Sequence, residues 1–376
     1  MKKIYFWSPH NSKIGTINSV INSITSIGKF SKKNYKAYLI DSTSEWKYLK
    51  DNFDIIELRK NKFDFRNLKN KGFFWSRIFY LNIFISCFIP LKRLLKYQKP
   101  EYLIIHLITS LPLFLFLFFN FKTKLILRIS GEPKLHFLRK LFWKILSNKV
   151  YKVTCPSSKT KEILIKNSIF NADQVIVLFD PIINIKKIKR HKDIDINKDY
   201  INTNYFLSVG RLTKQKNFDF LISAFKVISK SHTDLELIIL GEGEERENLE
   251  AKIKELNLTN IVHLKGFESN VFNYMKNAKG LILPSIYENP GHVLIEAAAC
   301  NCPIISSNCP TGPEEFLSQG RAGFLFEVNN KEDLIKKTNF FFDQNSKEAK
   351  EKKILAKKNS MKYTMFRHFK VLKSIL

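Results

Sequence analysis

The chain has 376 residues, 44% of them hydrophobic, which is enough to bury the cores of two domains and excludes a disordered chain or a small disulfide-stabilised scaffold. Lys and Arg total 63 against 34 Asp and Glu, so the net charge is +29 and an anionic partner is expected. Five cysteines without C-x2-C spacing support neither a disulfide framework nor a zinc site, which favours a reducing cytoplasm.

The positive charge is concentrated in the first half of the chain. Residues 1–200 hold 38 Lys and Arg against 14 Asp and Glu, a net charge of +24, whereas residues 201–376 hold 25 against 20, a net charge of +5. Such a basic surface could bind nucleic acid or an anionic membrane. Whichever the partner is, we expect it to bind to the first half of the chain.

The first half alternates short apolar runs with helical patterns, which predicts βα units around a parallel sheet. Its first run ends at Ser8-Pro9 after four apolar residues, so it is predicted to be a strand and not a secretory signal. The predicted strands are Lys3–Trp7, Ala37–Ile40, Asp54–Glu57, Tyr102–Leu107, Leu125–Ile129, Lys152–Cys155 and Gln174–Leu178.

Two Phe-rich stretches of this half are long enough to be tested as membrane spans. Polar residues and Pro112 interrupt residues 103–121, which predicts a buried strand and then a helix from about Pro112. Residues 73–90 contain Arg77 and precede a basic cluster at residues 92–99. That pattern fits an interfacial membrane helix or a buried core helix, and it does not favour a span.

The second half repeats the alternation and predicts a second doubly wound sheet. Its predicted strands are Tyr205–Val209, Glu236–Leu240, Ile261–Lys265, Gly280–Leu283, Pro303–Ser306 and Gly323–Phe326. Between the halves, charged residues crowd together without a strand or helix period, which predicts a linker. The expected organisation is an N-terminal Rossmann-like domain over 1–185, a linker over 186–203, a C-terminal Rossmann-like domain over 204–345, and a helical tail over 346–376 that packs back toward the N-terminal domain.

The densest motif lies at residues 284–297, where Glu288 and Glu296 are eight positions apart. Pro290 and Gly291 favour a helix start, which places Glu288 just before the helix and Glu296 in its second turn. Glu296 lies in an apolar run and needs a hydrogen-bonding partner; a ribose diol would provide one, and the free N–H groups of the helix start would face a diphosphate. Each Glu alone could equally be structural, as a core ion pair or a solvated helix end.

Arg211 and Lys216 follow a strand that ends at Gly210, on the loop leading into the next helix. The bidentate fork of Arg and the point charge of Lys suit phosphoryl oxygens. In a chain with 63 basic residues such a pair is weak support by itself. Its position at the carboxyl end of a strand is what favours ligand binding.

These motifs together resemble the retaining glycosyltransferases of family 4, which have the GT-B fold: two doubly wound Rossmann-like domains that face each other across a cleft. The resemblance covers about residues 205–327. The elements that carry it are Gly210-Arg211 with Lys216, Gly241-Glu242-Gly243, Val262-His263-Leu264-Lys265-Gly266-Phe267, the Glu288-x7-Glu296 pair, and Gly312-Pro313-x-Glu315.

The resemblance implies roles for particular residues. Arg211 and Lys216 would hold the nucleotide diphosphate, Glu288 the donor sugar, and Glu296 the ribose. Arg211, Lys216 and Glu288 are thereby the candidate catalytic residues. The implied donor-binding set is Arg211, Lys216, Lys265, Gly266, Phe267, Glu288, Asn289, Pro290, Gly291 and Glu296.

The first half departs from the family pattern. Where members often have a Gly-Gly pair after the first strand, only Gly15 is present in the segment His10–Thr16. After the strand at 125–129, where many members carry a His, this chain has Ser130 and Gly131. His106, at a strand end, is either a ligand-facing residue or a core histidine.

The sequence therefore predicts a retaining, metal-independent hexosyltransferase that needs no cofactor. It would move a sugar from a nucleotide-sugar donor, expected to be a UDP-sugar, to a glycan or lipid-linked glycan in bacterial-type surface polysaccharide synthesis. We expect it in the cytoplasm, in peripheral contact with the anionic cytoplasmic face of the membrane and without specific nucleic acid. The alternatives are a non-catalytic GT-B protein that binds nucleotide sugars and a nucleic-acid-binding protein, the latter disfavoured because no reading motif is present.

Overall fold

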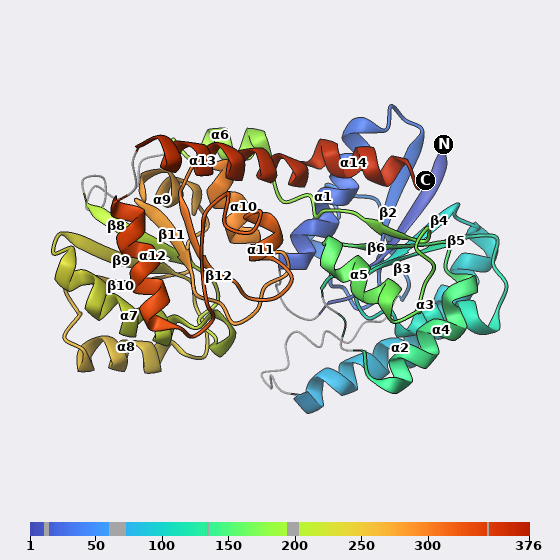
Figure 1. Cartoon of the computed structure of the whole chain (residues 1–376). Coiled ribbons are helices and arrows are strands. Elements are labelled where there is room, and N and C mark those ends of the chain that lie inside the picture. Colours follow the sequence, from blue (N-terminus) through green and yellow to red (C-terminus); the bar gives the residue numbers. More distant parts are fainter. Residues whose placement is uncertain (11–14, 60–72, 132, 134, 194–202, 344–345) are drawn as a thin grey trace. The chain divides into compact units, whose positions relative to one another are not determined.

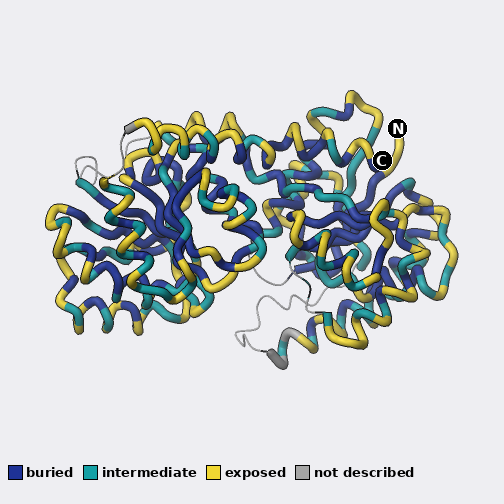
Figure 2. The backbone as a smooth tube through the Cα atoms, viewed as in Figure 1, coloured by how far each residue is buried: buried dark blue, intermediate teal, exposed yellow. Residues whose placement is uncertain are grey.

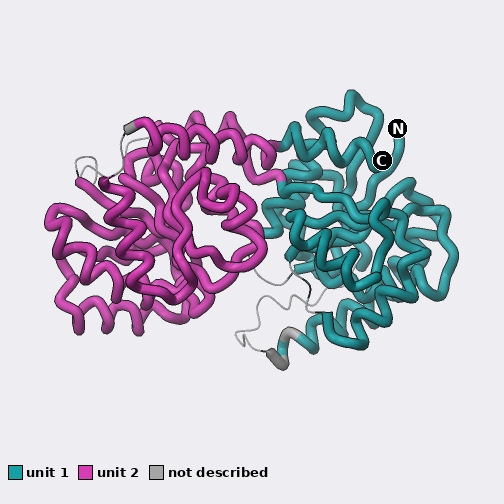
Figure 3. The backbone as a smooth tube through the Cα atoms, viewed as in Figure 1, with its two compact units in different colours: residues 1–180, 365–376 teal, residues 181–364 magenta. Residues whose placement is uncertain are grey.

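Two α/β units divide the chain, and Figure 3 shows them in different colours. In the computed structural model, the first unit comprises Met1–Asp180 and Met365–Leu376, and the second comprises Pro181–Thr364. The structure describes residues 1–10, 15–59, 73–131, 133, 135–193, 203–343 and 346–376. Each unit wraps helices around one parallel sheet (Figure 1), as the alternating apolar and helical patterns predict.

The described part of the first unit contains a seven-stranded parallel sheet in the order β3-β2-β1-β4-β5-β6-β7. Its strands are β1 (Lys2–Trp7), β2 (Tyr35–Asp41), β3 (Ile55–Glu57), β4 (Tyr102–Ile105), β5 (Lys124–Arg128), β6 (Lys152–Cys155) and β7 (Val175–Val177). Its helices are α1 (Gly15–Phe30), α2 (Phe73–Gln98), α3 (Ser110–Phe118), α4 (Phe137–Leu146), α5 (Ser158–Lys166) and α14 (Met365–Lys373). Every strand predicted for this half is confirmed, although β4 ends two residues before its predicted end.

Strand β1 is buried on both faces. Tyr5 and Trp7 pack into the core on one side of the sheet, and Ile4 and Phe6 pack into the core on the other. Burial on both faces is why this strand appears in the sequence as a continuous apolar run. β1 pairs with β2 on one side and β4 on the other, so the strand order reverses between β1 and β4.

Helix α2 has two different faces. One face contributes Phe79, Ile83, Cys87 and Leu91 to the core of the first unit, while the opposite face is exposed. Within the described chain, Arg77–Gln98 is the one helical segment whose length and hydropathy would allow a membrane crossing, and 28% of its most apolar window is buried. One face of the helix therefore packs in the core, while the exposed face leaves the interfacial membrane helix as an open alternative for this stretch.

The described part of the second unit contains a six-stranded parallel sheet in the order β10-β9-β8-β11-β12-β13. Its strands are β8 (Asn204–Val209), β9 (Leu235–Leu240), β10 (Val262–Gly266), β11 (Gly280–Leu283), β12 (Ile304–Ser307) and β13 (Phe324–Phe326). Its helices are α6 (Ile185–His191), α7 (Phe218–Ser231), α8 (Arg246–Glu255), α9 (Phe272–Asn277), α10 (His292–Ala299), α11 (Pro313–Phe316), α12 (Lys331–Asp343) and α13 (Ser346–Ser360). All strands predicted for this half are confirmed.

The sequence predicts an irregular linker over residues 186–203, but the first residues of this segment are helical. Residues 186–191 belong to α6, whose Asn184 cap accepts a hydrogen bond from the Lys187 N–H (3.2 Å) and whose Ile188 is buried. The many charged side chains hid this helix, because only one apolar residue in it faces the protein. Residues 194–202, the rest of the predicted linker, lie outside the described part.

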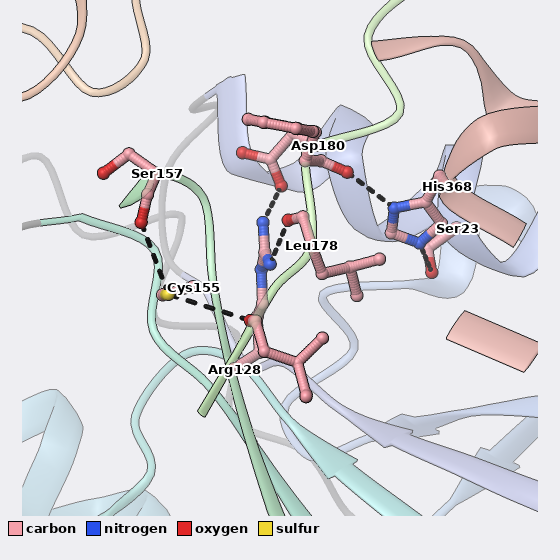
Figure 4. Close-up of polar contacts among 9 residues, drawn as sticks. Ser23, Arg128, Cys155, Ser157, Leu178, Asp180 and His368 are labelled. Carbon is pink, nitrogen blue, oxygen red and sulfur yellow. Dashed lines mark hydrogen bonds and ion pairs between the residues drawn. The ribbon is translucent and has the colours of Figure 1, made fainter. Parts of the chain in front are cut away.

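The C-terminal helix α14 packs on α1 within the first unit. Figure 4 shows His368 of α14 between two partners: its Nδ1 donates to the Phe179 carbonyl (2.8 Å), and its Nε2 accepts from the Ser23 hydroxyl (2.8 Å). A carbonyl can only accept, so Nδ1 carries a proton, and in the neutral ring that burial favours Nε2 accepts from the Ser23 hydroxyl. Nearby, Arg128 is buried and donates to Asp180 (2.6 Å) and to the Leu178 carbonyl.

This cluster predicts that the first unit loses stability in mild acid. Burial lowers the pKa of His368 to about 4, with Arg128 acting in the same direction. The unfolded chain takes up a proton below about pH 6.5 while the folded ring stays neutral, so stability is lost as the pH falls from 6.5 toward 4. Between pH 6.5 and 4.5 the loss from one such histidine is roughly 2 kcal/mol.

The measurement is urea unfolding across that pH range in the wild type and in His368→Gln. The variant is expected to be less stable at pH 7, because a hydrogen bond is lost, but to lose less stability on acidification. Equal pH slopes in the two proteins would contradict the assignment. Burial also lowers the pKa of His106, to about 3, so part of the acid sensitivity should remain in the variant.

Candidate functional site

The strand order of the second sheet defines where a ligand is expected. β8 pairs with β9 on one side and β11 on the other, and the chain leaves β8 toward β9 and β10 before returning to β11. Ligands of doubly wound sheets bind beyond the carboxyl ends of the strands at such a reversal. The two loops at this point are residues 210–217 and 284–291, and they contain Arg211, Lys216 and Glu288.

Lys216 and Glu288 form an ion pair across this reversal point. The ammonium of Lys216 contacts Glu288 Oε1, and the two side chains are only 17% and 8% exposed. The Ser285 hydroxyl donates to the same oxygen (2.7 Å), and Thr311 donates to the Glu288 carbonyl (2.7 Å). Within the described part of the chain, Glu288 Oε2 has no hydrogen-bond partner, so this oxygen is available to a ligand.

Close backbone packing holds these loops in place. An added Cβ on Gly241 would lie 1.8 Å from the Gly210 carbonyl oxygen, and one on Gly243 would lie 2.2 Å from the Leu212 oxygen. The Leu212 N–H donates to the Glu242 carbonyl (3.0 Å), which ties the loops after β8 and β9 together. The glycines of these turns are therefore required by contact, which fixes the position of Arg211 at the sheet edge.

Helix α10 follows the Glu288 loop, as the motif predicts. Gly291 has a φ of +84°, a conformation that favours glycine, and the helix begins at His292. Glu296 lies in the second turn and is partly buried. Burial raises the pKa of its carboxyl group, and the nearby His292 and Lys187 act against that rise. Among the described residues, no hydrogen bond reaches the Glu296 side chain, so the hydrogen-bonding partner predicted from the sequence is not supplied by them.

Two further polar groups of the site lack partners among the described residues. The Arg211 guanidinium is exposed and makes no hydrogen bond or ion pair. Both side-chain polar atoms of Asn289 are shielded from solvent and unsatisfied. Along the same edge, Gly266 closes β10 with its carbonyl accepting from the Gly241 N–H (2.7 Å), and the Phe267 ring is 78% exposed. The predicted residues at 265–267 thus lie beside the loop after β9.

The site contains no activated thiol. Burial raises the pKa of the Cys309 thiol to about 11, so this group stays protonated at neutral pH. No group of three or more His, Cys, Asp or Glu side chains suited to a metal ion occurs in the described part.

In the first unit, His106 and Ser130 line the same cavity of about 510 Å³, beyond the carboxyl ends of β4 and β5. His106 Nε2 is buried without a hydrogen-bond partner among the described residues. Gly15 is elsewhere, as the first residue of α1, and residues 11–14 of the same predicted loop lie outside the described part.

Sequence reasoning included Asn289 in the donor-binding set but missed Ser285 and Thr311. Ser285 stands three positions before Glu288 in the quoted motif, and its local spacing was a usable signal. Thr311 reaches the Glu288 backbone from 23 positions away, and nothing local indicates that contact.

Residues 189–359 match the model of a family described as glycosyl transferases group 1. This segment contains every residue predicted for donor binding in the second unit. Among curated proteins, the N-acetylgalactosamine-N,N'-diacetylbacillosaminyl-diphospho-undecaprenol 4-alpha-N-acetylgalactosaminyltransferase of Campylobacter jejuni is 31% identical over 227 residues. The alignment covers 58% of this chain and 60% of that protein, so the chain spans about three fifths of the length of this relative.

Two solved structures match the whole chain. A glycosyltransferase from Rickettsia africae gives a TM-score of 0.75 at 18% identity, covering 100% of this chain and 98% of that one. An Anabaena protein in complex with UDP gives 0.72 at 14% identity, covering 100% and 99%. The fold is GT-B. The fold class predicted from the sequence is thereby confirmed, and in a GT-B chain the sites described above lie at the carboxyl edges where doubly wound sheets bind ligands.

Proposed function

We propose that this chain is a glycosyltransferase that moves a sugar from a UDP-sugar to a glycan or lipid-linked glycan in the synthesis of a bacterial-type surface polysaccharide. The observation that carries the proposal is the cluster of Arg211, Lys216 and Glu288 at the reversal point of the second sheet, inside the segment similar to group 1 glycosyl transferases. The name of the Campylobacter relative includes a diphospho-undecaprenol-linked sugar, and the Anabaena structure holds UDP; both support this donor and acceptor class.

In this proposal the diphosphate is held by Arg211, Lys216 and the start of α10. The unpartnered guanidinium of Arg211 can give two parallel hydrogen bonds to phosphoryl oxygens. Lys216 adds a point charge whose position Glu288 fixes. The free N–H groups in the first turn of α10 carry partial positive charge and complete an anion site.

The donor sugar, ribose and base would be bound by the remaining residues. Glu288 Oε2 accepts from a sugar hydroxyl, and Glu296 accepts from the ribose diol, which supplies its missing partner. Asn289, whose amide is unsatisfied, contacts the sugar beside Glu288. Pro290 and Gly291 shape the turn, and the backbone at Lys265–Phe267 meets the edge of the base.

We propose a retaining reaction that needs no metal and no nucleophile from the protein. The bond between sugar C1 and the phosphate oxygen breaks while C1 bonds to the acceptor oxygen on the same face. The proton of the acceptor hydroxyl passes to the departing phosphate oxygen. Arg211 and Lys216 neutralise the charge that develops there, a role typically worth several kcal/mol.

The acceptor side is assigned to the first unit. His106 and Ser130 line its cavity and would contact the acceptor or the transferred sugar, and Gly15 would allow close approach of the backbone at the start of α1. We place the enzyme in the cytoplasm, peripheral to an anionic membrane, because the first 200 residues carry a net charge of +24.

Two other functions remain as competitors. A non-catalytic GT-B sensor would bind the nucleotide sugar with neither transfer nor hydrolysis, so turnover separates it from the enzyme. A nucleic-acid-binding protein would explain the +29 charge but not the unpartnered polar groups around α10.

The proposal is tested by a thermal-shift panel of UDP, GDP, ADP and their sugar conjugates. A ligand at 100 times its Kd stabilises the protein by about 2.7 kcal/mol, which for a domain of this size raises Tm by roughly 5–10 °C. We expect UDP and a UDP-sugar to give the largest rise. The absence of a response to every nucleotide would contradict both the enzyme and the sensor.

A further inference from the structure

Helix α4 presents an apolar surface to solvent. Its Phe137, Leu138, Leu141 and Ile145, here called the α4 stripe, are between 46% and 76% exposed. Trp143 and Leu146 are the two buried residues of the helix. In Figure 2 the buried backbone of each unit is concentrated in its sheet, and exposed segments lie on the helices around it. A surface helix normally shows the reverse arrangement, with its apolar residues against the core.

The members of the α4 stripe form one continuous line. At 3.6 residues per turn, Phe137, Leu141 and Ile145 follow each other at intervals of four, and Leu138 lies beside them. Large side chains exposed together in this way mark an interaction surface, unlike scattered single residues.

Basic residues border the stripe. Lys140 and Lys144 lie along one side of it at the helical period, and Lys149 follows in the next turn of the chain. Lys140 also donates to Asn167 of the neighbouring segment (3.1 Å), which holds its charge at this edge. An apolar line with cations beside it is the arrangement that lies in the interface of an anionic bilayer.

A second apolar line is present in the same unit. Leu81, Ile85 and Ile89 of α2 are exposed at intervals of four, and the next position in that series is the exposed Arg93. Helix α3 contacts both α2 and α4. The helices α2 and α4, which both contact α3, therefore share one pattern: a line of exposed apolar residues at intervals of four, followed by a basic residue at the next interval.

We propose that the α4 stripe inserts into the interface of an anionic lipid bilayer. Charge complementarity selects this occupant, because the first 200 residues carry a net charge of +24. The stripe also adjoins the cavity of the first unit, since Leu138 belongs to the stripe and, with Phe142 and Trp143, lines that cavity. Docking by α4 places the cavity at the lipid surface, where a lipid-linked acceptor is held; this consequence rests on the proposed function.

The test uses the full chain and flotation with two kinds of vesicle, phosphatidylcholine alone and phosphatidylcholine with 30% phosphatidylglycerol. We expect the wild type to float with the anionic vesicles and at least tenfold less with the neutral ones. The double variant Leu141→Asp/Ile145→Asp, which leaves the cavity lining intact, should lose at least tenfold in binding. Lys140→Gln/Lys144→Gln should reduce the preference for anionic lipid by roughly 30-fold, since each cation contributes about 1 kcal/mol.

Ile354→Asp is the matched control, because Ile354 is an exposed apolar residue on α13 of the second unit with 67% exposure. It should float as the wild type does. A tryptophan placed at each position tests whether that position enters the bilayer. On vesicle binding, the fluorescence of Ile145→Trp should shift to the blue and be quenched by brominated lipid, whereas that of Ile354→Trp should not change.

Wild-type binding by Leu141→Asp/Ile145→Asp, or no flotation of the wild type with either vesicle, would overturn the proposal. Thermal shifts with UDP keep the two proposals separate. A protein that floats through α4 but ignores every nucleotide would refute the proposed function alone, and one that binds UDP but never floats would refute the α4 docking alone.

Discussion

Replacing Lys216 by Met is expected to destabilise the protein by roughly 3–5 kcal/mol and to abolish most of its transfer activity. Without Lys216, Glu288 keeps a single described donor, the Ser285 hydroxyl, for a carboxylate that is 8% exposed. Removing one partner of a buried pair leaves the other charge uncompensated, and this costs more than the pair itself contributes.

The double variant Lys216→Met/Glu288→Gln separates stability from activity. With both charges removed, most of the lost stability should return, because no unpaired charge remains. Transfer should stay at least roughly 100-fold below wild type, since the phosphate loses a cation and the sugar loses an ionised acceptor. Urea unfolding and initial rates of transfer or donor hydrolysis measure the two effects.

The exposed pair of Lys276 and Asp193 provides the control. Its ammonium and carboxylate are 2.8 Å apart but 46% and 57% exposed, in the same unit. Lys276→Met should change stability by less than about 0.5 kcal/mol, as is usual for surface pairs. If the Lys216 variant were equally stable, or if the double variant were no more stable than the single, the pair could not have the role assigned to it.

Arg211→Ala is expected to weaken nucleoside-diphosphate binding by roughly 10- to 150-fold. The guanidinium is exposed at the carboxyl edge and has no described partner, so its loss removes ligand contacts without disturbing the fold. A charge-assisted hydrogen bond of about 1.5–3 kcal/mol corresponds to that range at 1.4 kcal/mol per decade. Calorimetric titration with UDP measures it, and Arg211→Lys should restore only part, because an ammonium lacks the planar fork.

Arg321→Ala is the matched control for charge. Arg321 is also an exposed arginine of the second unit, but it precedes β13 and so lies toward the amino end of the sheet. This variant should bind UDP normally, and both variants should float with anionic vesicles as the wild type does. Parallel loss of UDP and vesicle binding in Arg211→Ala would instead assign phosphate binding to general basicity.

Local sequence patterns were sufficient for the architecture of this protein. Each strand is a short apolar run bounded by turn residues or charges. A strand buried on both faces, such as β1, requires apolar residues at consecutive positions, so the sequence pattern identifies it. The start of α10 was predictable for a similarly local reason, since Pro290 restricts its own φ and Gly291 can adopt the positive φ that the turn requires. The beginning of α6 escaped prediction because its single buried residue, Ile188, gives no periodic signal.

The sequence by itself determined which residue types stand at the strand ends, because the order of apolar runs and loops is a property of the chain. Only the tertiary structure decided that Lys216 and Glu288, 72 positions apart, form one ion pair, and that Thr311 reaches the same loop. Strand order brings those loops together, and the pairing of β8 with β11 depends on packing across the whole sheet. The exposure of the α4 stripe could likewise not be predicted from the sequence. An amphipathic pattern shows that a helix has two different faces, but in α4 the tertiary structure decided which face packs against the core.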